Sequence, residues 1–153
     1  MSLVTQEQAS DFAWLWKEKS AALIELGRYE EAKEIHQTII GLAPEKAWTY
    51  GNIGLDYYLM KEFDKAIENC QQAVSMDPDD VALRYNLALF RLADGEVEKA
   101  LETYQEALEM DSDLQRTDEA MDNIIEAQER WSDLTQLQEG LDFLRDAKSK
   151  RAK

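Results

Sequence analysis

The stretch AWTYGNIGLDYYLMKEFDKAIENCQQAVSMDP, residues 47–78, holds two runs of apolar residues at helical spacing. The first run covers residues 48–60 and the second covers residues 63–76, with only two residues between them. Apolar residues three and four positions apart predict amphipathic helices. Because proline cannot continue a helix, Pro78 ends the second run. The stretch therefore predicts two helices joined by a short turn.

Landmark residues of this stretch recur along the chain. Ala66 has counterparts at Ala32 and Ala100, so the three alanines are 34 residues apart. Gly27 and Gly95 mark the turns of the units before and after it. A fixed period of this length is the sequence signature of a repeat architecture. We expect repeat one at about 13–46, repeat two at 47–80 and repeat three at 81–114.

The rest of the chain continues the period more weakly. Leu134 and Leu141 keep the spacing, and residues 115–148 predict a degenerate fourth helical pair that caps the stack. Residues 149–153 form a basic tail, which suits the C-terminal end of a last helix because the helix dipole favours cations there. At the other end, Thr5 is a candidate N-cap of the first helix.

The pattern resembles the tetratricopeptide repeat (TPR) family, in which large, small and turn residues recur over 34 positions. The second unit carries the resemblance best, with Tyr50, Ile53, Gly54, Tyr57, Ala66, Cys70, Ala73 and Pro78. The resemblance implies one all-α TPR domain over residues 1–153, a right-handed α-solenoid of helix-turn-helix units. Small residues at Gly54 and Ala66 predict close approach of the two helix backbones. The stretch DPDD, residues 77–80, is expected to end one unit and cap the next helix.

In the TPR family the first helix of each pair lines a concave groove that commonly holds a peptide. The resemblance implies a peptide-binding groove lined by Trp14, Lys17, Trp48, Asn52, Leu55, Leu59, Tyr85, Asn86, Leu89, Arg116 and Asn123, with Ala21 and Ala82 beside them. Large apolar members would be exposed there, which favours a partner. Amides at Asn52 and Asn86 can bond a peptide backbone. The alternative is that several of these side chains pack between repeats.

One branch of the family grips the EEVD tail of heat-shock chaperones with two lysines, two asparagines and an arginine. Lys17 and Asn52 match that carboxylate clamp. Ala21, Ala82 and Asn86 stand where Asn, Lys and Arg are required. Two matches of five cannot hold a peptide carboxylate well, since charge-assisted hydrogen bonds provide most of that grip. We therefore expect a different ligand.

The charge balance narrows the class of partner. The chain has 17 basic and 32 acidic residues, a net charge of -15. Phosphates repel such a surface, so we expect neither nucleic acid nor anionic membrane as a ligand. A protein or peptide partner that is basic or carries apolar anchors fits better.

Motifs for chemistry are absent from the sequence. His36 is the single histidine, which excludes two-histidine zinc sites, and it takes the aromatic position of the first unit, where a packed side chain is expected. No phosphate loop, nucleophile elbow or zinc-protease motif occurs. We expect no enzyme activity, no metal and no cofactor. Cys70 is the single cysteine, a small core residue that suits a reducing cytoplasm.

The sequence thus predicts a protein–protein interaction module, a TPR adaptor or scaffold. One alternative is a small acidic TPR chaperone for a secreted or aggregation-prone client. The other is self-assembly into a homo-oligomer, through the repeats or through the helix around residues 134–147.

Overall fold

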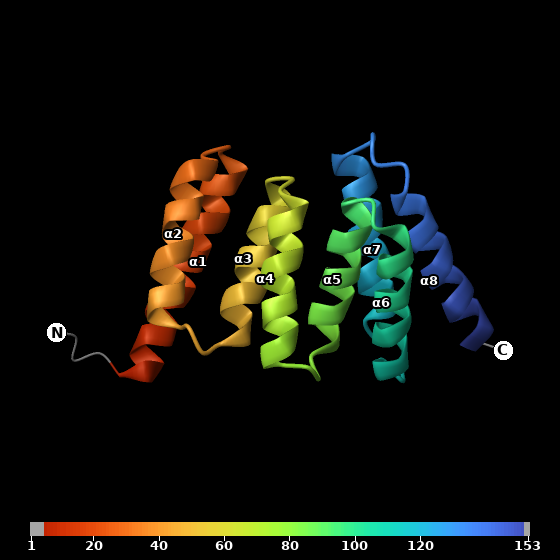
Figure 1. Cartoon of the computed structure of the whole chain (residues 1–153), viewed down its shortest axis with the longest axis horizontal. Helices are drawn as coiled ribbons and strands as arrows, with labels where there is room; N and C mark the ends of the chain where they lie inside the picture. Colours follow the sequence, from red (N-terminus) through yellow and green to blue (C-terminus); the bar gives the residue numbers. More distant parts are fainter. Residues whose placement is uncertain (1–4, 152–153) are drawn as a thin grey trace. The chain divides into compact units, whose positions relative to one another are not determined.

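A computed structural model describes residues 5–151 of the chain as helices joined by short turns (Figure 1). No strand occurs among these residues, and none of their helices has the length and apolar character needed to cross a membrane. In chain order the helices are α1 (Gln6–Glu25), α2 (Tyr29–Leu42), α3 (Ala47–Leu59), α4 (Phe63–Met76), α5 (Val81–Ala93), α6 (Val97–Met110), α7 (Thr117–Arg130) and α8 (Leu137–Arg151). The all-helical prediction and the helix-turn-helix pairing are confirmed.

The helices form two compact units, residues 1–76 and residues 77–153. Unit 1 contains the pairs α1–α2 and α3–α4, and its core includes Ala13, Ile24, Ile35 and Ile39. Thr5 caps α1 as predicted, because its hydroxyl accepts from the Gln8 backbone N–H while the Gln8 side chain accepts from the Thr5 backbone N–H. The predicted small core residue Cys70 is fully buried.

The close approach of α3 and α4 is confirmed. A Cβ added at Gly54 would lie 3.1 Å from the Ala66 carbonyl oxygen and 3.3 Å from the Cys70 backbone nitrogen. Both neighbours are backbone atoms of a packed helix, which cannot move aside as a side-chain tip can. Glycine at position 54 therefore sets the distance between the two helices.

The turns inside the repeats use a left-handed residue at one repeat position. Gly27 and Gly95 have φ values of 75° and 86°, a region that glycine enters without steric cost. Lys61 occupies the same position in the second repeat, with φ of 64°. The turn geometry thus persists where the glycine does not, at a local conformational cost.

Unit 2 contains the pairs α5–α6 and α7–α8, with α8 packed against α6 as well as α7. The cap expected within residues 77–80 is Asp80, which accepts from the Leu83 backbone N–H at the start of α5. The last helix extends through Arg151, so residues 149–151 of the expected basic tail are helical, and residues 152–153 lie outside the described residues. The Arg151 guanidinium donates to the carbonyls of Leu108 and Asp111 at 2.7 and 3.0 Å. This contact satisfies backbone acceptors at the C-terminal end of α6.

Candidate functional site

Unit 1 carries an aromatic surface where α1 and α3 meet. Trp14 is 52% exposed, and its ring meets Trp48 edge to face with centroids 6.3 Å apart. The Lys17 ammonium lies 4.0 Å from the centroid of the Trp14 ring and 3.3 Å from a carboxylate oxygen of Glu18. An exposed indole beside a cation is an amphipathic surface that suits contact with a partner.

The other three residues expected in this part of the groove lie on α3 with different exposures. Leu55 is exposed, Asn52 is half-buried, and Leu59 is half-buried against the unit 1 core. Trp48 packs partly against the same core. Leu59 and Trp48 therefore contribute to the stability of unit 1, whereas Leu55 presents its side chain to solvent.

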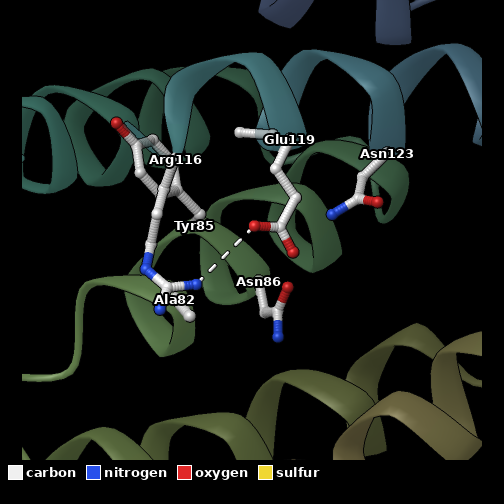
Figure 2. Close-up of a pocket in the computed structure, with 7 residues that line it drawn as sticks. Ala82, Tyr85, Asn86, Arg116, Glu119 and Asn123 are labelled. Carbon is white, nitrogen blue, oxygen red and sulfur yellow. Dashed lines mark ion pairs between the residues drawn. The ribbon is translucent and has the colours of Figure 1, made fainter. Parts of the chain in front are cut away.

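Unit 2 carries a small pocket between α5 and α7 (Figure 2). Its walls are Ala82, Tyr85, Asn86, Arg116, Glu119, Ala120 and Asn123. Four of these, Tyr85, Asn86, Arg116 and Asn123, are residues that the sequence assigned to the groove. Figure 2 shows the polar side chains of both helices directed toward the same space. The structure thus brings these four together within unit 2.

The prediction that Tyr85 and Leu89 are exposed in the groove is wrong. Tyr85 and Leu89 are each only 5% exposed, because α5 packs against α6, α7 and α8. The Tyr85 hydroxyl donates to an Asp111 carboxylate oxygen at 3.0 Å and lies 3.1 Å from the Thr117 hydroxyl. Burial raises the pKa of the Tyr85 phenol to about 12, and the hydrogen bond to the Asp111 carboxylate also raises it. Tyr85 therefore forms the floor of the pocket with its hydroxyl already bonded, and Leu89 is a core residue.

Three asparagines at the expected positions have unused side-chain amides. Asn52, Asn86 and Asn123 are half-buried, and none forms a side-chain hydrogen bond with any described residue. By contrast, the Asn69 amide on α4 donates to the Lys65 carbonyl at 2.9 Å. An amide offers two donors and an acceptor, so each of the three can bond a peptide group.

The pocket also contains an acidic residue that the sequence analysis missed. Glu119 pairs with Arg116 at 3.6 Å, and both side chains are more than half exposed. Their separation of three positions at the start of α7 is the signal that could have revealed the pair. Arg116 therefore has a carboxylate neighbour, which weakens its attraction for an acidic ligand.

A buried polar cluster in unit 1 also escaped the sequence analysis. The Ser20 hydroxyl donates to Asp56 Oδ2 at 2.6 Å, and His36 Nε2 lies 2.9 Å from the same oxygen. The cluster joins α1, α2 and α3, and it confirms the packed His36. Asp56 in the apolar run of α3 is the one signal for it.

Among the described residues, no group of three His, Cys, Asp or Glu side chains could hold a metal ion.

Family comparisons agree with the repeats. Sequence models of the tetratricopeptide repeat match residues 16–46, 47–80 and 69–102. The first two matches each end where a repeat was expected to end, whereas the third begins within α4 and ends within α6. No curated protein sequence matches the chain.

Several solved structures share the fold. The TPR2B domain of yeast Sti1, solved in complex with an Hsp70 peptide, has a TM-score of 0.64 at 23% identity over 80% of this chain and 98% of that one. The second TPR domain of human RPAP3, solved with an HSP70 peptide, has a TM-score of 0.60 at 15% identity over 92% and 98%. The Yersinia enterocolitica type III secretion chaperone SycD, solved with a YopD peptide, has a TM-score of 0.64 at 19% identity over 91% and 96%.

Proposed function

Since the chain belongs to the tetratricopeptide repeat family, we propose that it is a protein-interaction module that holds a peptide segment of a partner protein. Each unit offers a contact surface: the Trp14–Trp48 surface in unit 1 and the α5–α7 pocket in unit 2. The observation that carries the proposal is the set of unused amides at Asn52, Asn86 and Asn123. Such amides bond a peptide backbone whatever its side chains are.

The partner segment is apolar or basic rather than an acidic tail. Trp14 and Leu55 offer exposed apolar contact area, which anchors apolar side chains. Lys17 is already paired with Glu18, and Arg116 is paired with Glu119. The peptides in the RPAP3 complexes, SRMEEVD and SGPTIEEVD, end in acidic residues. The chain lacks the two cations that would hold such an end, because Ala82 and Asn86 stand where Lys and Arg are required, and Ala21 replaces the required Asn.

The proposal includes no catalysis. Ser20, His36 and Asp56 are residue types of a hydrolase triad, but a triad has the histidine between the serine and the acid. Here one oxygen of Asp56 accepts from the Ser20 hydroxyl and lies beside His36 Nε2. All three side chains are buried, so this cluster stabilises unit 1. We place the module in a reducing cytoplasm, which the single buried Cys70 supports.

The test is capture of partners from native lysate, read by mass spectrometry. The double variant Asn52→Ala/Asn86→Ala removes one unused amide from each unit. Asn69→Ala is the matched control, because its amide bonds the backbone of its own helix. We expect a protein captured by wild type and by Asn69→Ala but lost with the double variant. Equal capture by all three contradicts the proposal.

A second candidate is a chaperone for an aggregation-prone client, supported by the likeness to SycD and by the net charge of -15. Light scattering during aggregation of an apolar client separates the two. A chaperone suppresses aggregation at stoichiometric ratio, whereas an adaptor leaves it unchanged.

A further inference from the structure

Helix α1 carries a second apolar stripe on its solvent side. Leu15 and Leu26 are 65% and 70% exposed, and Phe12 is 48% exposed. Phe12, Leu15, Lys19, Ala22 and Leu26 follow one another at alternating spacings of three and four, so they share one face. The core of unit 1 is served by a different face of α1, which carries Ala13, Leu23 and Ile24. The exposed stripe is therefore not needed to fold unit 1.

A groove between α1 and α2 adjoins this stripe at Lys19. It is lined by Trp16, Lys19, Leu23, Arg28, Glu31, Glu34, Ile35 and Thr38. Three of its lining side chains are apolar, Trp16 and Leu23 from α1 and Ile35 from α2, and the others are polar or charged, with Arg28 and Glu31 forming an ion pair. We call the stripe and this groove together the α1 face. The apolar stripe alone is about 21 Å long, from the rise of a helix over residues 12–26.

The last helix shows that such a face is not required at an end of the repeats. In α8, Leu137, Leu141 and Leu144 are all buried. Its exposed positions are all polar or charged, among them Glu139, Asp142, Arg145 and Lys150. A polar outer side is what a terminal repeat needs for solubility. The α1 face departs from that rule, and a large exposed apolar patch favours an interaction site.

An acidic row flanks the α1 face. Glu7, Asp11, Glu18 and Glu25 are all exposed, and spacings of four and seven place them along one side of α1. Glu18 pairs with Lys17, whereas Glu7, Asp11 and Glu25 form no ion pair with any described residue. The row lies between the apolar stripe and Trp14 on the helix circumference. Its charge is available to a cationic ligand.

We propose that the α1 face binds an amphipathic helix of a partner protein whose apolar side is flanked by lysine or arginine. A helix lies along a straight apolar strip with contacts every three or four residues. Basic flanks match the acidic row and would direct its orientation. A second copy of this chain fits less well, because a two-fold contact through the α1 face brings the acidic row to it from both sides. The site is separate from the peptide-binding surfaces proposed above.

Fluorescence anisotropy tests the inference with a labelled leucine–lysine amphipathic peptide, about 18 residues long. The double variant Leu15→Ser/Leu26→Ser should weaken binding about tenfold or more, since both leucines lose buried contact area. Their exposure means that circular dichroism and the unfolding midpoint should stay those of wild type. Leu55→Ser on α3 should leave the peptide affinity unchanged, which separates this site from the proposed function.

The charge contribution has its own control. Asp11→Asn/Glu25→Gln should weaken binding about threefold or more at low salt and reduce its salt dependence. Glu68→Gln/Glu102→Gln changes the net charge equally at exposed positions on α4 and α6 and should have no effect. Equal loss in both double variants overturns the inference, because it shows attraction to the net charge alone. Absence of peptide binding overturns it, as does a wild-type dimer that Leu15→Ser/Leu26→Ser converts to monomer.

Discussion

Both units bury a carboxylate that joins three helices, but the two clusters occupy different repeat positions. In unit 1, Asp56 on α3 accepts from Ser20 and lies beside His36 Nε2, whereas His36 Nδ1 forms no hydrogen bond with any residue that the structure describes. In unit 2, Asp111 at the end of α6 accepts from Tyr85 on α5 and from Thr117 on α7. The backbone N–H of Arg116 donates to the same Asp111 oxygen.

The difference shows that the repeat determines helices and turns but not the polar interior. Ser20 takes the position of Gly54 and Ala88 in the other repeats, and its hydroxyl needs a buried acceptor. Asp56 supplies that acceptor. Asp111 instead bonds the loop before α7 and the first turn of that helix. One unit thus uses its buried carboxylate inside the stack, and the other uses it at a connection.

The largest expected effect is loss of the unit 1 cluster. Asp56→Ala leaves the buried Ser20 and His36 side chains without their acceptor, and we expect unfolding to become easier by about 3 kcal/mol. Urea unfolding followed by circular dichroism measures this. Asp122→Ala, an exposed aspartate on α7, should change the free energy of unfolding by less than about 0.5 kcal/mol. Equal effects in the two variants would show that the cluster contributes no stability.

The next effect contrasts helix contacts in the two units. Gly54→Ala should destabilise by about 2 kcal/mol, because the new methyl meets backbone atoms of α4. Gly140→Ala in α8 should also destabilise, because its methyl would meet the fully buried Leu92 side chain. Gly41→Ala in α2 meets nothing within 4 Å and should stabilise by about 0.5 kcal/mol. Thermal unfolding of the three variants gives the order of their stabilities. If Gly54→Ala lowered the unfolding midpoint least, the close approach of α3 and α4 would be contradicted.

The smallest effect concerns the unit 2 cluster. Tyr85→Phe should destabilise by about 1 kcal/mol, because Asp111 keeps its bonds from Thr117 and Arg116. The pKa of Tyr85 is raised from 10.0 to about 12 in the folded chain, so the unfolded chain loses this proton first. The stabilisation of the folded chain by the neutral Tyr85 hydroxyl is therefore complete below pH 10 and is lost as the pH rises toward about 12.

Urea unfolding of wild type and Tyr85→Phe at increasing pH measures this contribution. The stability gap between the two proteins should narrow over the alkaline range. A gap that stays constant there would mean that Tyr85 titrates alike in the folded and unfolded chain.

The helices were predictable because their signals are local. Period, turn glycines and caps such as Thr5 and Asp80 lie within a few residues of the structure that they determine. The candidate site was harder, because exposure depends on which helices cover a residue. Tyr85 and Leu89 share a helix with Asn86, yet packing of α5 buries the first two. The Asp56 cluster depends on residues 16 to 36 positions apart, which no local pattern reports.

Site-specific photo-crosslinking shows whether a protein segment binds on the first helix of each pair, at the Trp14–Trp48 surface and the α5–α7 pocket. A benzophenone amino acid would replace Leu55 on α3 or Asn86 on α5, with Glu68 on α4 and Glu102 on α6 as controls. We expect adducts with the same partner protein from Leu55 and Asn86, and none from the control positions. Adducts only at Glu68 or Glu102 would contradict this expectation and place the binding surface on the second helix of each pair.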